Sequence, residues 1–103
     1  MLLLSRFIIS GHSMEPTLQQ GQNVLVSYIP YLFVKPKIDD MVLIRHEENR
    51  FLIKRITKID GEKYFVGGDN KKDSMDSRRF GWILKKDIAG KVILKAQALV
   101  SYV

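Results

Sequence analysis

Apolar and polar residues alternate along most of this chain in short runs that are separated by turn residues. In the first run, at 5–10, Phe7 and Ile9 fall on one face of an extended segment and Ile8 falls on the other. Further runs that alternate or are rich in β-branched residues lie at 24–29, 41–45, 51–59, 64–66 and 90–100. This pattern predicts a mostly β chain, folded as a small antiparallel sheet or barrel.

The segments between these runs carry turn signals. A turn is expected at 19–23, and Asp60 followed by Gly61 is a strong hairpin signal. The apolar segment 31–34 lies between two prolines and is expected to be a loop or a sheet edge. A long charged loop should follow Gly67, and a short helical turn is expected at 85–88. The predicted helical content is therefore very small.

Length and composition bound the kind of protein. We expect the 103 residues to form a single domain, and 46% apolar with 27% charged residues is typical of a globular protein. The apolar start at 1–9 is too short to span a membrane and is interpreted as a strand. We therefore expect a cytoplasmic protein or one that is peripheral at a membrane surface, unless an anchor segment has been lost from the amino terminus.

The residue types exclude several kinds of site. The chain has no cysteine, so disulfides, thiolate catalysis and cysteine–zinc sites are absent. Two histidines, His12 and His46, are too few for a convincing metal cluster. We accordingly expect neither a metal nor an organic cofactor. The net charge of +6 suits an anionic membrane surface or nucleic acid, but it also suits simple solubility.

Lys54 is a candidate general base. On a strand it shares its face with Leu52 and Ile56, so it either lies at a sheet border with its amine in water or is buried. Burial disfavours the ammonium form and lowers the pKa. Moving the pKa from about 10.4 to about 7 or 8 requires roughly 3 to 5 kcal/mol, which apolar burial can supply. The local pattern permits a neutral lysine and leaves both positions open.

Ser13 is a candidate nucleophile. It follows a strand, with Gly11 before it and Pro16 after it, so its hydroxyl is expected on a sharp corner. The alternative is an ordinary turn in which Ser13 caps the residues that follow. His12 is a poor partner, because adjacent side chains on an extended backbone face apart. A serine hydroxyl needs a base to become an effective nucleophile, and Lys54 can act as one only when it is neutral.

Five segments, in order along the chain, are similar to the sequence boxes of the type I signal peptidases. They lie at 10–18, 21–26, 40–44, 52–56 and 68–81. One such match would be weak, whereas five in order over nearly the whole chain are specific. The resemblance implies that Ser13 is the nucleophile, Lys54 the general base and Ser74 the hydroxyl that orients the lysine amine. It also implies a mostly β fold of the signal-peptidase type and catalysis without a cofactor.

The resemblance assigns supporting roles to three charged residues. Asp76 and Arg78 match a structural ion pair beside the site, and Asp69 matches a second acidic partner there. The alternative for Asp76 and Arg78 is a solvated surface pair that contributes little to stability. In either interpretation these side chains would support the site rather than react.

The resemblance also implies how a substrate would bind. Phe7, Ile9 and Gly11 match positions that line the substrate pockets, where small side chains before the scissile bond are held. A precursor protein would then bind as an extended strand. The alternative is that Phe7 and Ile9 are simply core residues. Some relatives have a serine where Gly11 stands, and its hydroxyl completes the oxyanion hole. Here the second oxyanion donor is unassigned.

The resulting prediction is a serine endopeptidase that removes an N-terminal signal or leader peptide from a precursor protein. Short relatives include cytoplasmic peptidases that mature nickel superoxide dismutase, and Arg45 followed by His46 resembles that subgroup. The alternative from another class is a basic β-barrel that binds nucleic acid through Tyr28, Tyr31 and Phe33. That alternative explains the charge but not the ordered segments, so we expect no nucleic acid partner.

An apolar run at 28–34 precedes Lys35 and Lys37. Such a run is either folded under as core or presented as a surface patch. The resemblance implies a catalytic domain that lies against a bilayer. We therefore expect reversible, peripheral contact with an anionic membrane, with the lysines adding electrostatic attraction.

Overall fold

The computed structural model describes residues 4–48, 50–72 and 75–96. Seven strands of the described chain form one sheet, in which every pairing is antiparallel and the order is β1-β2-β7-β3-β4-β5-β6. The strands are β1 (Ser5–Ile8), β2 (Asn23–Ser27), β3 (Met41–Arg45), β4 (Phe51–Asp60), β5 (Lys63–Gly67), β6 (Ile83–Leu84) and β7 (Ile88–Ala96). The helical segments are α1 (Pro30–Phe33), α2 (Ser77–Phe80) and the 3-10 turn η1 (Lys85–Asp87).

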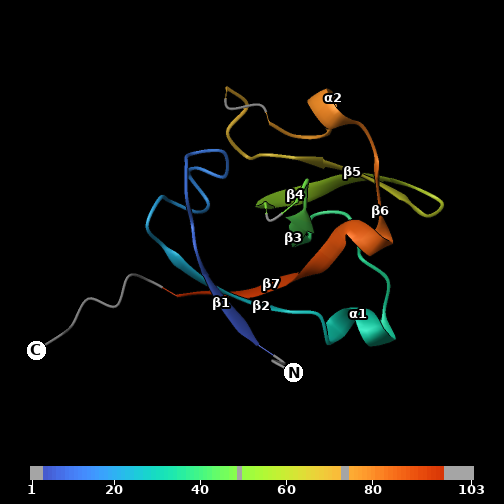
Figure 1. Cartoon of the computed structure of the whole chain (residues 1–103), viewed down its shortest axis with the longest axis horizontal. Coiled ribbons are helices and arrows are strands. Elements are labelled where there is room, and N and C mark those ends of the chain that lie inside the picture. Colours follow the sequence, from blue (N-terminus) through green and yellow to red (C-terminus); the bar gives the residue numbers. More distant parts are fainter. Residues whose placement is uncertain (1–3, 49, 73–74, 97–103) are drawn as a thin grey trace, which may run out of the picture.

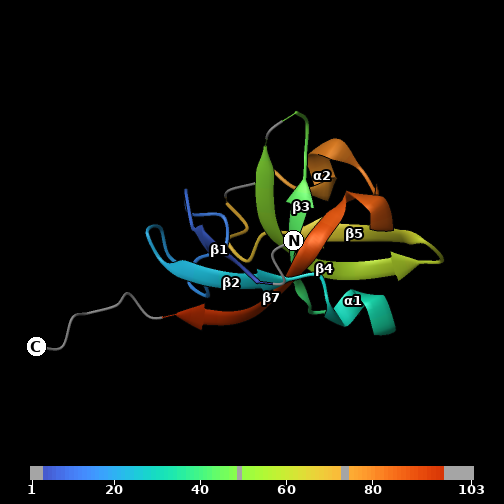
Figure 2. The same cartoon turned by 60° about the horizontal axis from the view of Figure 1, so that its bottom comes forward.

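The sheet curls into a half-barrel, as the two views in Figure 1 and Figure 2 show. The curl brings the outer strand β1 over the start of β4, where the rings of Phe7 and Phe51 lie 5.9 Å apart between centroids. The loop that follows β1 lies beside the loop that follows β5 in both views. Two segments that are far apart in the sequence, 10–20 and 68–72, therefore meet at one end of the half-barrel.

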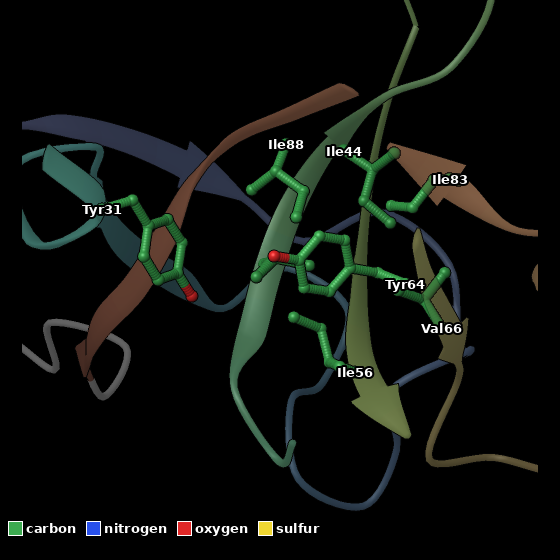
Figure 3. Packing of buried hydrophobic residues seen from close by; sticks show 8 residues of the cluster. Tyr31, Ile44, Ile56, Tyr64, Val66, Ile83 and Ile88 are labelled. Carbon is green, nitrogen blue, oxygen red and sulfur yellow. The ribbon is translucent and has the colours of Figure 1, made fainter. Parts of the chain in front are cut away.

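The two faces of the sheet carry two separate groups of buried side chains. The first group, shown in Figure 3, contains Tyr31, Val42, Ile44, Ile56, Tyr64, Val66, Ile83 and Ile88. The second contains Ile9, Met14, Leu18, Val24, Val26, Leu43 and Val92. Successive residues of a strand face opposite sides, so Lys54 lies on the first face opposite Val42, and Ile53 lies on the second face opposite Leu43.

The predicted mostly β fold is confirmed, and so is most of the strand pattern. The strand at Met41–Arg45 has the expected bounds, and the hairpin at Gly61 joins β4 to β5 with a φ of 60° at the glycine. The expected helical turn is η1. The last strand, β7, begins at Ile88, two residues before its predicted start at position 90. The predicted positions 97–100 lie outside the described residues.

The sequence prediction was wrong at two helical segments. The segment 31–34 was expected to be a loop or edge, but Pro30–Phe33 forms α1, because a proline at the first helical position is preorganised for a helix. The helix α2 lies in the expected long loop. Asp76 caps it by accepting a hydrogen bond from the Arg78 backbone N–H, and Gly81 ends it with a φ of 85°.

The helix α1 divides the apolar run at 28–34. Tyr31 is buried and its hydroxyl donates a hydrogen bond to Asp40 at 2.8 Å, so its ring is not available to stack on a nucleic acid base. Leu32 and Phe33 are 65% and 81% exposed, and Val34 is half exposed. Tyr31 thus anchors the run to the core, and Leu32, Phe33 and Val34 form an exposed apolar patch. No helix within the described residues has the length and apolar character needed to span a membrane.

Candidate active site

The loop between β1 and β2 carries Ser13. Two of its side chains, Met14 and Leu18, are buried in the second core group, and the Leu18 backbone N–H donates to the Met14 carbonyl at 2.9 Å. The Glu15–Pro16 peptide bond is cis. With its neighbour Met14 fixed in the core, Ser13 stays only partly buried. The expected corner is therefore present, with the serine at its surface.

The same loop is held against the segment that follows β5. The backbone N–H of Asn70 donates to the Ser13 carbonyl at 2.8 Å, and the Asn70 side-chain amide donates to the His12 carbonyl at 3.1 Å. Gly68 lies so close that a Cβ atom there would stand 2.6 Å from the Ser13 carbonyl oxygen. Only glycine fits at this position without moving the backbone of the serine loop.

Lys54 lies in the interior of the fold. Its side chain is 2% exposed and is the largest among the fully buried ones in the described chain. It is flanked on its face by Val42 across the strand pair and by Ile56 two residues along, and both of these are 0% exposed. Of the two positions that the sequence left open, the structure has the buried one. Burial at this depth disfavours the ammonium form of a lysine.

The residue after Lys54 ties this strand to the serine loop. Arg55 binds Asp69 through two parallel hydrogen bonds of 2.9 Å, from Nε to Oδ1 and from Nη2 to Oδ2. Asp69 also accepts a hydrogen bond from the Thr17 hydroxyl at 2.5 Å. The hydrogen bonds from Arg55 lower the pKa of the Asp69 carboxyl, against the opposing effect of burial. We call these three residues the Arg55–Asp69–Thr17 clamp.

The sequence interpretation did not include this clamp. It assigned Asp69 to the Asp76–Arg78 pair as a second acidic partner, and the structure also binds Asp69 to Arg55. Sequence reasoning gave no role to Arg55 or Thr17. The arginine was overlooked because strand alternation places it on the face away from Lys54, and alternation says nothing about which loop covers that face.

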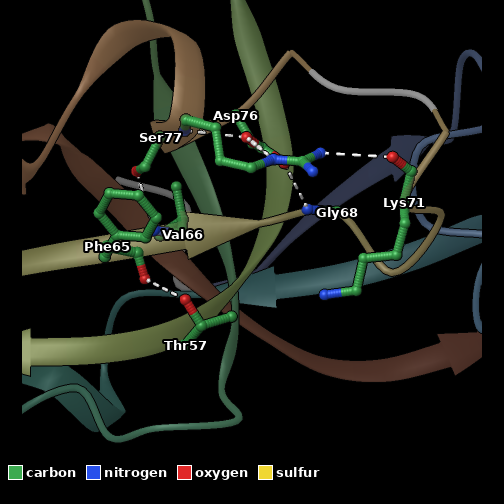
Figure 4. Close-up of polar contacts among 8 residues, drawn as sticks. Thr57, Phe65, Val66, Gly68, Lys71, Asp76 and Ser77 are labelled. Carbon is green, nitrogen blue, oxygen red and sulfur yellow. Dashed lines mark hydrogen bonds and ion pairs between the residues drawn. The ribbon is translucent and has the colours of Figure 1, made fainter.

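Asp76 and Arg78 form a second ion pair beside the first. Arg78 Nε lies 3.1 Å from Asp76 Oδ1, and Arg78 Nη2 lies 3.1 Å from Asp76 Oδ2. Asp76 is 1% exposed and also accepts from the backbone N–H of Gly68 at 3.3 Å, as Figure 4 shows. Burial alone would raise the pKa of Asp76, but the hydrogen bonds from Arg78 and Gly68 outweigh it and lower the pKa. The carboxylate therefore fixes Gly68, the residue that touches the serine loop.

A cavity of about 120 Å³ opens beside Ser13, between β1 and β4. Its lining includes Phe7 from β1 and Ile9 just after it, together with Phe51 and Ile53 from β4. Ile9 is also buried in the second core group, and Phe7 packs against that group. The two interpretations of these residues are thus compatible, because the same side chains form the core and the wall of the cavity.

Ser74 and Gly11 are the two remaining positions of the predicted site. Ser74 lies outside the described residues. Gly11 has a φ of 87°, a conformation that strains residues with a side chain, so glycine rather than serine suits this backbone. Among the described residues, no group of three or more histidine or acidic side chains is arranged to hold a metal ion.

The two ion pairs make the stability of the fold dependent on pH. Both carboxyls have folded-state pKa values below their ordinary value, so their stabilising effect is present above about pH 4 and is lost as the pH falls through the lower folded-state values. The substitution Asp69→Asn removes one of these two carboxyls. We expect the free energy of unfolding of this variant, measured with urea between about pH 2 and 6, to fall less steeply with acid than that of the wild type.

Asp60→Asn is the matched control, because Asp60 is exposed at the end of β4. This variant should follow the wild-type pH dependence. Equal slopes for Asp69→Asn and the wild type would contradict the structural role assigned to the carboxylate of Asp69.

The sequence was compared with known proteins. A family profile described as "Signal peptidase, peptidase S26" matches residues 1–63 and 57–96. Signal peptidase I V of Bacillus subtilis (strain 168) is 27% identical over an alignment of 135 positions, which covers 82% of this chain and 80% of that protein. The mitochondrial ATP-independent inner membrane protease subunit 1a of Arabidopsis thaliana is 30% identical over an alignment of 120 positions, which covers 87% of this chain and 71% of that protein.

The profile covers both of the segments that meet in the structure, the serine loop and the segment after β5. The mostly β half-barrel and the position of Ser13 beside a cavity agree with the peptidase names of the relatives. The chain therefore belongs to the signal peptidase family, peptidase S26, and is a peptidase of that family.

Proposed function

We propose that this chain is a serine endopeptidase that removes an N-terminal signal or leader peptide from a precursor protein, with Ser13 as nucleophile and Lys54 as general base. The observation that carries the proposal is the burial of Lys54 on β4, next to the residue that clamps the serine loop. Removing a lysine from water costs free energy, so a buried lysine is a candidate functional residue. A neutral amine is also the form that can accept a proton from a serine hydroxyl.

The reaction proceeds in two halves. In the first, Ser13 Oγ attacks the scissile carbonyl and its proton passes to Lys54 Nζ. The tetrahedral intermediate then breaks its C–N bond, and the leaving amine takes that proton. In the second, Lys54 accepts a proton from water, which attacks the acyl-enzyme. The ester bond breaks and the proton returns to Ser13. The backbone N–H of Ser13 serves as one oxyanion donor.

The substrate binds as an extended strand at the outer edge of β1. This strand pairs only with β2 in the described sheet, so its other edge has backbone groups available for a further strand. The cavity beside Ser13 takes alternate side chains of the substrate. With about 120 Å³ between Phe7 and Phe51 it favours small side chains near the scissile bond.

Substitution of either residue tests the proposed Ser13–Lys54 dyad. Ser13→Ala and Lys54→Met should each abolish cleavage of a precursor protein, followed by mass spectrometry of the products. Because the two residues act as a unit, the double variant should be hardly worse than either single one. Methionine has nearly the volume of lysine, so it keeps the buried position filled. Turnover of Lys54→Met near the wild-type rate would rule out lysine as the base.

A second prediction tests the contact between Gly68 and the serine loop. Gly68→Ala places a methyl group against the Ser13 carbonyl oxygen and should displace the nucleophile, lowering kcat/KM by about 100-fold, as misplacements of about 1 Å do. Gly67→Ala is the matched control, since its Cβ would meet atoms only at 3.7 and 3.8 Å. That control should keep most of the activity. Equal activity of the two variants would show that the contact does not position Ser13.

We also propose that the exposed patch of α1 contacts an anionic membrane. Leu32, Phe33 and Val34 are exposed, and the exposed lysines Lys35 and Lys37 follow them. Each lysine near such a surface adds attraction of about 1 kcal/mol. The patch is formed by a helix that a single buried tyrosine anchors to the core. Contact of this kind is shallow and reversible.

Vesicle co-sedimentation at low salt tests this contact. The wild type should bind vesicles that contain anionic lipid, and Leu32→Ser/Phe33→Ser should lose most of the binding. The control Ile93→Ser/Leu94→Ser removes two exposed apolar side chains from β7 and should bind as the wild type does. No sedimentation of the wild type with anionic vesicles would refute the membrane contact.

A further inference from the structure

A second hollow, of about 230 Å³, is lined by Gly68 and is distinct from the cavity beside Ser13. Its walls come from β4, β5 and the segment that leads into α2. Gly68 belongs to its lining and also touches the serine loop, where a Cβ atom would meet the Ser13 backbone. Gly68 therefore links this hollow to the serine loop, although the two hollows have no lining residue in common.

The lining of this second hollow carries more positive than negative charge. Lys58, Lys71 and Arg78 are the cations, and Asp76 is the carboxylate. Asp76 is buried, and both of its oxygens are already bound by Arg78, with Gly68 adding a further hydrogen bond. The side chains of the two lysines are exposed, and Lys58 Nζ lies 5.2 Å from the centre of the Phe65 ring. Figure 4 shows Lys71 beside the strand that ends at Gly68. The Asp69 carboxylate near Lys71 is already bound by Arg55, so an incoming anion would meet an excess of positive charge.

The direction of β1 relates this hollow to the substrate. β1 runs from Ser5 towards Ile8, and the chain then continues to Ser13. A peptide whose residues before the scissile bond lie beside Phe7 and Ile9 must continue beyond Ser13 after that bond. An extended peptide advances about 3.3 Å per residue. Gly68 touches the serine loop and lines the second hollow, so this hollow is placed to receive the first few residues after the bond.

We infer that this hollow receives the residues that follow the scissile bond and that Lys58 and Lys71 select an acidic side chain among them. This inference rests on the proposed function, because it assumes cleavage at Ser13. It extends that function by naming a property of the substrate: the mature protein begins with an acidic segment. The two lysines determine specificity and take no part in bond breaking.

Peptide kinetics test the inference. A cleavable peptide is made with Glu, Gln or Lys at each of the first three positions after the scissile bond, one position at a time, and kcat/KM is measured for each. We expect the wild type to prefer Glu to Lys by about two- to fivefold at one or more of these positions, the size expected for exposed charge pairs. The preference should shrink as the salt concentration rises.

The variant Lys58→Glu/Lys71→Glu should reverse the preference while still cleaving the Gln peptides. The control Lys63→Glu/Lys86→Glu makes the same change in net charge at exposed positions outside this hollow and should keep the preference for Glu. Equal rates for Glu and Lys peptides in the wild type, or the same reversal in the control, would overturn the inference. Failure of the wild type to cleave even the Gln peptides would instead refute the proposed function.

Discussion

The Arg55–Asp69–Thr17 clamp is the interaction on which the site depends. It joins three segments that the sequence keeps apart, namely the strand of Lys54, the segment after β5 and the serine loop. The side chains of Arg55 and Asp69 are 26% and 19% exposed, so the pair lies between a surface pair and a buried one. Surface pairs contribute up to about 1 kcal/mol, whereas breaking a buried pair costs about 3 to 5 kcal/mol. The two parallel hydrogen bonds between Arg55 and Asp69 also fix the position of the segment after β5 relative to β4.

Around this clamp the fold solves two opposite problems. The proposed mechanism requires Lys54 to be removed from water, and the closely packed residues Val42 and Ile56 surround it on the first face of the sheet. It also requires Ser13 to stay accessible, and the corner after β1 leaves Ser13 only partly buried. Gly68 lets the two loops approach without a side chain between them, and Asp76 holds Gly68 in place. Rigid support of this kind is what a reacting pair of groups requires.

Much of this arrangement was predictable from the sequence, and the failures have physical causes. Alternation at 5–10 correctly placed Phe7 and Ile9 on one face, because a two-residue period is a local property of a strand. Whether Lys54 is buried could not be decided from the residues around it in the sequence. Its face was predictable, but whether that face is covered depends on strands far along the chain. The partner of Arg55 was missed for the same reason, since Asp69 reaches it only after the hairpin returns.

In the proposed mechanism the fold keeps Lys54 neutral so that it can accept the proton of Ser13. The most direct measurement is an NMR titration of the Lys54 side chain in the folded protein, assigned with Lys54→Met and compared with the exposed Lys63. We expect a pKa for Lys54 well below the ordinary lysine value of about 10.4, because the side chain is buried among apolar groups. A Lys54 amine that titrates at the ordinary lysine value would contradict it.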